Sequence, residues 1–144
     1  MRAAVEFSEI PRDECLQLLS QRSVGRLAIV RKGRPLIFPV NYALQGEVVV
    51  FRTDPGQKLL GSHLRKVAFE VDEVDDAAGT GWSVLLQGYG YEITNAIDDR
   101  SRSHRELRVT PMVPGEPRHW IEIIPETITG RRIAFRVRSV HQPQ

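Results

Sequence analysis

The sequence predicts a small, mainly β domain: an antiparallel barrel of six or seven strands with two or three short helices at its periphery. Short apolar or alternating segments recur along the chain, which is typical of strands. Turn residues such as Gly33 and Gly46 separate these segments at the spacing of hairpins. A chain of 144 residues is long enough to bury a core without disulfides or a structural metal. We therefore expect one domain over residues 1–144, with its core at about 10–137 and a frayed tail at 138–144.

The first element expected is a short helix that begins at Pro11. Proline is favoured at the first position of a helix, and the two acidic residues near it suit the first turn. Cys15, Leu18 and Leu19 then repeat at helical spacing and form one apolar stripe. No activating His or Arg can be named beside the thiol, so we expect Cys15 to be a small core side chain.

Strands follow this helix. The segments expected to be strands are 25–31, 36–44, 48–53, 67–72, 82–94, 120–125 and 128–137. Pro39 interrupts the second of them, and because proline cannot donate to a ladder we expect a sheet edge or a bulge there. Gly88 and Gly90 indicate a bend or a bulge in the fifth.

Two more helical segments are expected between these strands. Asp54 is a good N-cap, Gln57 follows in the capping-box position, and apolar residues at helical spacing come after it. The segment 95–108 is highly charged and predicts a solvated loop with a short helix. The segment 109–118 contains several prolines, so we expect it to be irregular.

Composition and charge exclude several classes of protein. Lys and Arg total 20 against 18 Asp and Glu, and a net charge of +2 predicts no strong nucleic-acid field. The Arg-rich segment 131–138 is the one feature that favours RNA or DNA, and we expect no nucleic-acid partner. The single cysteine, the lack of an apolar signal core and the lack of a long apolar run predict a cytoplasmic protein with no membrane association.

No motif for metal binding or nucleophilic catalysis is found. The histidines lack the spacing of metal ligands with each other or with Cys15; they are His63, His104, His119 and His141. The acidic segment 72–76 is more typical of a solvated turn than of a cation site. No nucleophile has a base beside it in the sequence, so the catalytic residues are unknown. If the protein is an enzyme, a cofactor is expected to supply the reactive atoms.

The most informative segment runs from Phe51 to Lys58. A buried strand ends in Arg52 and Thr53, and the capped helix begins at once with Lys58 in its first turns. A guanidinium, a hydroxyl, an ammonium and the helix N–H groups near one point favour a bound phosphate. The alternative is that Arg52 and Lys58 are surface charges beside a helix cap.

Two further segments are candidates for contact with a flat heteroaromatic ring. Pro39 leaves main-chain groups unpaired, and Asn41 and Tyr42 add hydrogen-bonding groups beside it. The alternative is that Tyr42 is a core residue and Asn41 a bulge residue. Trp82, next to Ser83, is either a stacking wall for such a ring or a plug at the end of the barrel.

Together these segments resemble the pyridoxamine 5'-phosphate oxidase-like proteins, the flavin-binding split barrels. The resemblance extends from Val24 to Ile133 and is closest to the short branch with a Gly-Trp-Ser-Val motif. It depends on six motifs in the same order: Gly25-Arg26-Leu27, Pro39-Val40-Asn41-Tyr42, Phe51-Arg52-Thr53 with Gly56 and Lys58, Phe69-Glu70-Val71-Asp72, Gly81-Trp82-Ser83-Val84 with Gly88, and Ile128-Thr129-Gly130-Arg131.

The resemblance implies a six-stranded antiparallel split barrel, usually a homodimer, with flavin mononucleotide (FMN) at the subunit interface. It places residues 39–42 beside the isoalloxazine ring, Arg52 and Thr53 near the phosphoribityl chain, and Lys58 at the phosphate. Ser83, with Trp82 beside it, occupies a position from which the family often supplies a side chain to the flavin. The cofactor-binding residues implied in this way are Pro39, Val40, Asn41, Tyr42, Phe51, Arg52, Thr53, Lys58, Trp82 and Ser83.

The function that follows is an FMN-dependent oxidoreductase that transfers a hydride or electrons to or from a small organic substrate. The vitamin-converting oxidases of the family end in a basic, His-containing segment, which the end of this chain lacks. We therefore do not expect pyridoxamine phosphate oxidation. The alternative function is a non-catalytic protein that binds a flavin, a deazaflavin or haem.

Overall fold

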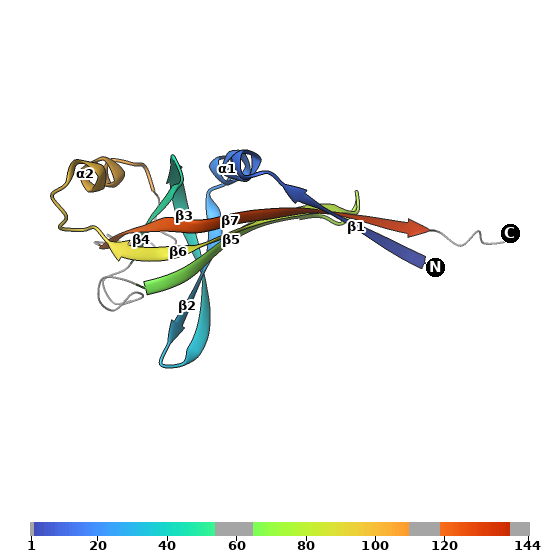
Figure 1. Ribbon diagram of the computed structural model, residues 1–144, viewed down its shortest axis with the longest axis horizontal. Coiled ribbons are helices and arrows are strands. Elements are labelled where there is room, and N and C mark those ends of the chain that lie inside the picture. Colours follow the sequence, from blue (N-terminus) through green and yellow to red (C-terminus); the bar gives the residue numbers. More distant parts are fainter. Residues whose placement is uncertain (1, 54–64, 110–118, 139–144) are drawn as a thin grey trace, which may run out of the picture.

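The computed structural model describes residues 2–53, 65–109 and 119–138, and it is mainly β (Figure 1). The elements, in chain order, are β1 (Arg2–Ile10), α1 (Arg12–Ser20), β2 (Val24–Arg31), β3 (Arg34–Gln45), β4 (Val48–Thr53), β5 (Arg65–Asp75), β6 (Thr80–Glu92), α2 (Asp99–Arg105) and β7 (His119–Arg138). The helix expected from Asp54, with Gln57 and Lys58, and the tail at 139–144 lie outside the described residues.

All strand pairs are antiparallel, in the order β1-β7-β4-β3-β2-β5-β6, and β6 also pairs with β7. Six strands therefore close into a barrel, which confirms the predicted split-barrel class. The described chain has seven strands rather than six, because β1 pairs with residues 130–138 of β7. In Figure 1 β1 and this part of β7, which we call the arm, extend away from the rest of the barrel, and β6 pairs with β7 here as far as Ala134.

The sequence did not predict β1. Residues 6–9 of this strand are exposed, and the strand is held by main-chain pairing that runs from Arg2↔Arg138 to Ile10↔Gly130. A strand that buries so little apolar surface carries no hydrophobic alternation.

β7 is one continuous strand, whereas two strands, 120–125 and 128–137, were predicted. At the expected break the strand contains a β-bulge: Gln87 pairs with Thr127 and Gly88 pairs with Pro125, so Glu126 is the extra residue. A Cβ on Gly88 would lie 2.0 Å from the Ile124 carbonyl oxygen, which explains the glycine. The bulge predicted at Gly88 is confirmed.

The barrel core consists of the inward side chains of the six strands, closed at one end by α1. The largest fully buried apolar members include Leu27, Phe51, Phe69, Leu86 and Ile123. The helix contributes Cys15 and Leu19, which confirms the predicted core position of Cys15. Burial is the main cause that raises the pKa of this thiol. None of the helices in the described part of the chain is long and apolar enough to cross a membrane.

Candidate functional site

Strand alternation places the sequence-predicted site residues on two different sides of the barrel wall. Those that point inward are buried or pack against the core: Val40, Tyr42, Phe51, Thr53 and Trp82. Those on the outer side are Pro39, Asn41, Arg52 and Ser83. Lys58 lies outside the described residues. A ligand on the outer face therefore meets the main chain of Val40 and Tyr42, and not their side chains.

Tyr42 is an inward-facing residue whose side chain is buried in the core. Its hydroxyl donates to the Leu19 carbonyl oxygen at 2.5 Å, and its ring meets Phe69 edge-on with 4.9 Å between centroids. Burial raises the pKa of Tyr42 well above its ordinary value. The side chain therefore joins β3 to the end of α1.

Trp82 also faces the barrel interior. It packs against the core, and the Arg22 guanidinium lies 5.8 Å from its ring centroid. Arg22 also pairs with Glu73. The side chain of Ser83, the next residue of the motif, is on the opposite side of β6 and lines an outer pocket.

Arg52 lies at the end of β4, on the outer face. Its guanidinium stacks over Trp120, its cross-strand partner on β7, at 4.8 Å from the ring centroid. Tyr42 pairs with Phe51, which brings Asn41 and Arg52 to the next position of the two strands. The positive charge of Arg52 thus lies beside β3, the strand that contains Pro39, and at the C-terminal end of β4.

β2 and β5 separate β3 from β6 on this face, and they contain charged residues without a predicted role. Pro39 pairs with Arg26, Arg26 pairs with Glu70, and Asp72 pairs with Ser83. Arg26 Nη1 donates to Glu70 Oε1 at 2.8 Å and to Asp72 Oδ2 at 2.9 Å. We refer to Arg26, Glu70 and Asp72 as the Arg26 cluster.

The Arg26 cluster has unusual acid–base properties. Burial, together with a hydrogen bond to Asp72 and the charge of Asp72, raises the pKa of Glu70 to about 7, against the lowering effect of Arg26. The hydrogen bond to Glu70 and the contact with Arg26 hold the pKa of Asp72 below its ordinary range. The surroundings therefore shift the pKa of Glu70 upward and that of Asp72 downward, so Asp72 is the more readily ionised of the two carboxyl groups.

Sequence reasoning found no acid or base in the ring-facing segments: Glu70 and Asp72 were expected on the polar side of a half-buried strand, and the acidic residues from 72 to 76 in a solvated turn. Two-residue spacing does place Glu70 and Asp72 on one face of a strand. Their partner Arg26 is 44 residues from Glu70, and strand pairing of this kind cannot be derived from one sequence.

Pockets lie along the same strands, and the one that contains Ser83 is on the outer face. A pocket of about 410 Å³ is lined by Ser83, Leu85, Thr129 and Arg131 of β6 and β7 and by Glu9 of β1. A second, of about 580 Å³, lies along the arm and Trp82, and a third, of about 480 Å³, lies across β2, β5 and the bulge. Large apolar side chains are exposed on the same strands: Phe7, Val30, Ile37, Val74 and Leu85.

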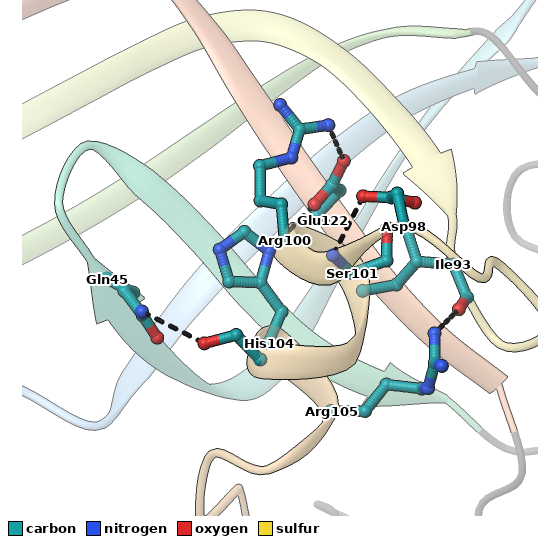
Figure 2. Close-up of polar contacts among 9 residues, drawn as sticks. Gln45, Ile93, Asp98, Arg100, Ser101, His104, Arg105 and Glu122 are labelled. Atoms are coloured by element: carbon teal, nitrogen blue, oxygen red, sulfur yellow. Dashed lines mark hydrogen bonds and ion pairs between the residues drawn. The ribbon is translucent and has the colours of Figure 1, made fainter.

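A buried carboxylate that the sequence did not predict holds α2 against the barrel. Figure 2 shows Glu122 of β7, which is 1% exposed, between Arg100 and His104 of the helix. Arg100 Nη2 lies 2.7 Å from Oε1, and His104 Nδ1 lies 2.8 Å from Oε2. Glu122 is two residues from Trp120 on β7, so its contact with α2 anchors the part of β7 that lies beside Arg52.

Other hydrogen bonds complete this anchor, as Figure 2 shows. Asp98 caps the helix by accepting the Ser101 N–H at 3.0 Å, and this bonding holds the pKa of Asp98 below its ordinary range. Arg105 donates to the Ile93 carbonyl oxygen. The short helix expected in 95–108 is present, but its inner side is buried against β7 and is not a solvated loop.

Known proteins similar to this chain were found by sequence and by structure. A family model described as pyridoxamine 5'-phosphate oxidase matches residues 11–132. The uncharacterized protein Rv0080 of Mycobacterium tuberculosis is 32% identical over 144 residues, which cover 96% of this chain and 93% of that protein.

Two solved structures share both the fold and part of the sequence. The FAD binding protein from Mycobacterium smegmatis is 30% identical, with a TM-score of 0.72 over 87% of this chain and 98% of that one. A conserved protein of unknown function, DIP1874, from Corynebacterium diphtheriae is 33% identical, with a TM-score of 0.69 over 90% and 98%.

Proposed function

Because the chain belongs to the pyridoxamine 5'-phosphate oxidase family, we propose that it is a flavin-dependent oxidoreductase. It binds FMN on the outer face of the barrel and transfers a hydride or electrons to or from a small organic substrate. The observation that carries the proposal is the arrangement at β3 and β4. There Arg52 provides positive charge at a strand end, directly beside the strand that contains Pro39 and Asn41.

The residues present fit a flavin nucleotide. Arg52, together with Lys58 from outside the described residues, suits the phosphate, because a guanidinium binds phosphate oxygens in a planar, two-point manner. The exposed edge of β3 at Pro39 offers main-chain groups, and Asn41 and Ser83 offer side-chain hydrogen bonds. The flavin, when bound, supplies the redox chemistry, and the chain binds it, orients it and shields it from water.

The proposed assembly is a homodimer with the cofactor at the interface. Phe7 of β1, Ile37 of β3 and Val74 of β5 are 62%, 68% and 61% exposed. A second copy of the chain buries this apolar surface and covers a flat cofactor at the same time. The buried thiol of Cys15 suits the reducing conditions of the cytoplasm, where we place the protein.

FAD is the alternative flavin, because the Mycobacterium smegmatis relative is named for FAD binding. FAD contains the same ring and extends the molecule beyond the phosphate, so both flavins fit one ring site. That name states binding and no reaction, which favours a second candidate function: a protein that holds a flavin without turnover.

The test is a titration of the purified protein with FMN, FAD, riboflavin, a deazaflavin coenzyme and haemin, followed by visible absorbance and fluorescence. We expect saturable flavin binding. Multiple turnover with a nicotinamide donor or a reduced deazaflavin supports the oxidoreductase. A bound flavin that neither donor reduces favours the second candidate, and no flavin binding at tens of micromolar refutes both.

A further inference from the structure

We propose that the Arg26 cluster is part of the ring site, where protonated Glu70 turns the hydrogen that it otherwise donates to Asp72 toward a carbonyl oxygen or ring nitrogen of the flavin. Arg26 and Asp72 are its positioning residues. The proposal rests on the proposed function, because it needs a flavin on the outer face. It adds a proton-exchanging group to a site for which the sequence offered none.

Position is the first argument. Arg26 is the cross-strand partner of Pro39, and Asp72 is the cross-strand partner of Ser83. The cluster therefore adjoins both segments that the sequence nominated for contact with the ring. A ring bound against Pro39 adjoins Arg26, a ring bound against Ser83 adjoins Asp72, and Glu70 is held between them by its bond to Arg26.

Hydrogen bonding is the second argument. Arg26 Nη1 donates a hydrogen bond to one carboxylate oxygen of Glu70 and to one of Asp72, and these bonds fix both carboxyl groups on the outer surface. The side chains of Glu70 and Asp72 are 32% and 30% exposed, so both are held firmly and still reach a ligand. A flavin ring offers hydrogen-bond acceptors along one edge, and a carboxylic acid is a strong donor to them.

Proton affinity is the third argument. The pKa of Glu70 is raised to about 7 chiefly by burial, and the charged groups that act on it are Asp72 of its own strand and Arg26 of β2. On β6, the facing residues Leu85 and Ser83 carry no charge. A ring that covers the cluster removes more water from it, which favours the neutral acid further. Binding of the ring is therefore coupled to protonation of Glu70.

The experiment measures the dissociation constant of riboflavin from about pH 5.5 to 8.5 for the wild type and for Glu70→Gln. Riboflavin is used beside FMN because a phosphate monoester itself titrates near pH 6 (roughly). In the wild type the affinity is expected to be constant below the pKa of Glu70 and to fall by up to about tenfold per pH unit above it. In Glu70→Gln, whose amide still donates, we expect a pH-independent affinity.

Two variants that keep Glu70 test the positioning role. Arg26→Gln removes the cation that lowers the pKa of Glu70, so the midpoint of the affinity profile moves to higher pH. Asp72→Asn removes a neighbouring negative charge, so the midpoint moves to lower pH. Glu47→Gln, which removes an exposed carboxylate paired with Arg12 far from the face, is the control and leaves the profile unchanged.

The outcomes separate the two proposals. Three results overturn the role of Glu70 and leave the flavin site standing. They are riboflavin binding that does not depend on pH, a pH profile that is the same in Glu70→Gln as in the wild type, and binding that strengthens as the pH rises. If Glu70→Gln does not fold, the opposite shifts of Arg26→Gln and Asp72→Asn decide the question. If no flavin binds the wild type at any pH, the proposed function itself is overturned, and the role of Glu70 with it.

Discussion

Replacing Glu122 by leucine tests whether this buried carboxylate anchors α2. The substitution removes the acceptor of His104, whose ring is 4% exposed, and leaves its nitrogen buried without that partner. A buried polar group that loses its partner costs about 1–3 kcal/mol. Arg100 is 58% exposed and turns to water at little cost. We therefore expect a loss of about 1–3 kcal/mol in the free energy of unfolding.

The double variant Glu122→Leu/His104→Phe is the matched control. It replaces both partners by apolar groups, which is often close to neutral because no buried polar group is left unpaired. We expect it to recover most of the loss. The assay is urea unfolding followed by circular dichroism, with a thermal scan as a second readout at about 4 °C per kcal/mol. A single variant within about 0.5 kcal/mol of the wild type, or a double variant less stable than the single one, refutes the reasoning.

Three further predictions concern the barrel. Tyr42→Phe removes the hydroxyl that donates to the Leu19 carbonyl oxygen, which keeps only the longer bond from the Arg22 N–H, and is expected to cost about 1 kcal/mol in urea unfolding; an unchanged midpoint contradicts it. Gly88→Ala brings a Cβ against main chain of β7 and is expected to destabilise by more than about 2 kcal/mol, which the same assay measures; wild-type stability refutes the bulge. Folding raises the pKa of Glu70 from 4.5 to about 7, so the folded chain binds an extra proton between these values. Stability is therefore expected to fall as pH rises through this window and to level off above it, a decline that Glu70→Gln removes from a series of unfolding curves.

The sequence predicts the barrel well where a strand buries apolar side chains in the core. β4 runs over Val48–Thr53, as the unbroken apolar run indicated, because its residues are packed on both faces. The sequence did not predict β1, because main-chain pairing with β7, and not burial of apolar side chains, holds this strand in place. The apparent gap between two closing strands is a bulge around Glu126, and a local pattern cannot distinguish a bulge from a turn.

For the candidate site, the sequence nominated residues by their type. It indicated only in part on which side of the barrel wall each side chain lies. The phosphate site expected around Arg52 was inferred from local spacing, because the end of the strand and the expected start of the helix are adjacent in the chain, and it stays a prediction. The Arg26 cluster and the contact of Glu122 with His104 join residues from different elements. Such pairs depend on strand order and on register, which one sequence does not determine.

The central claim, that the outer face binds FMN with its phosphate at the end of β4, is tested most directly by the affinities of Lys58→Ala for FMN and riboflavin. We expect FMN binding to weaken by about 5- to 150-fold, equivalent to about 1–3 kcal/mol, and riboflavin binding to stay as in the wild type. Arg34→Ala, which removes an exposed positive charge at the β2–β3 turn, is expected to change neither affinity. Equal losses for the two ligands, or no loss of FMN affinity, contradict the claim.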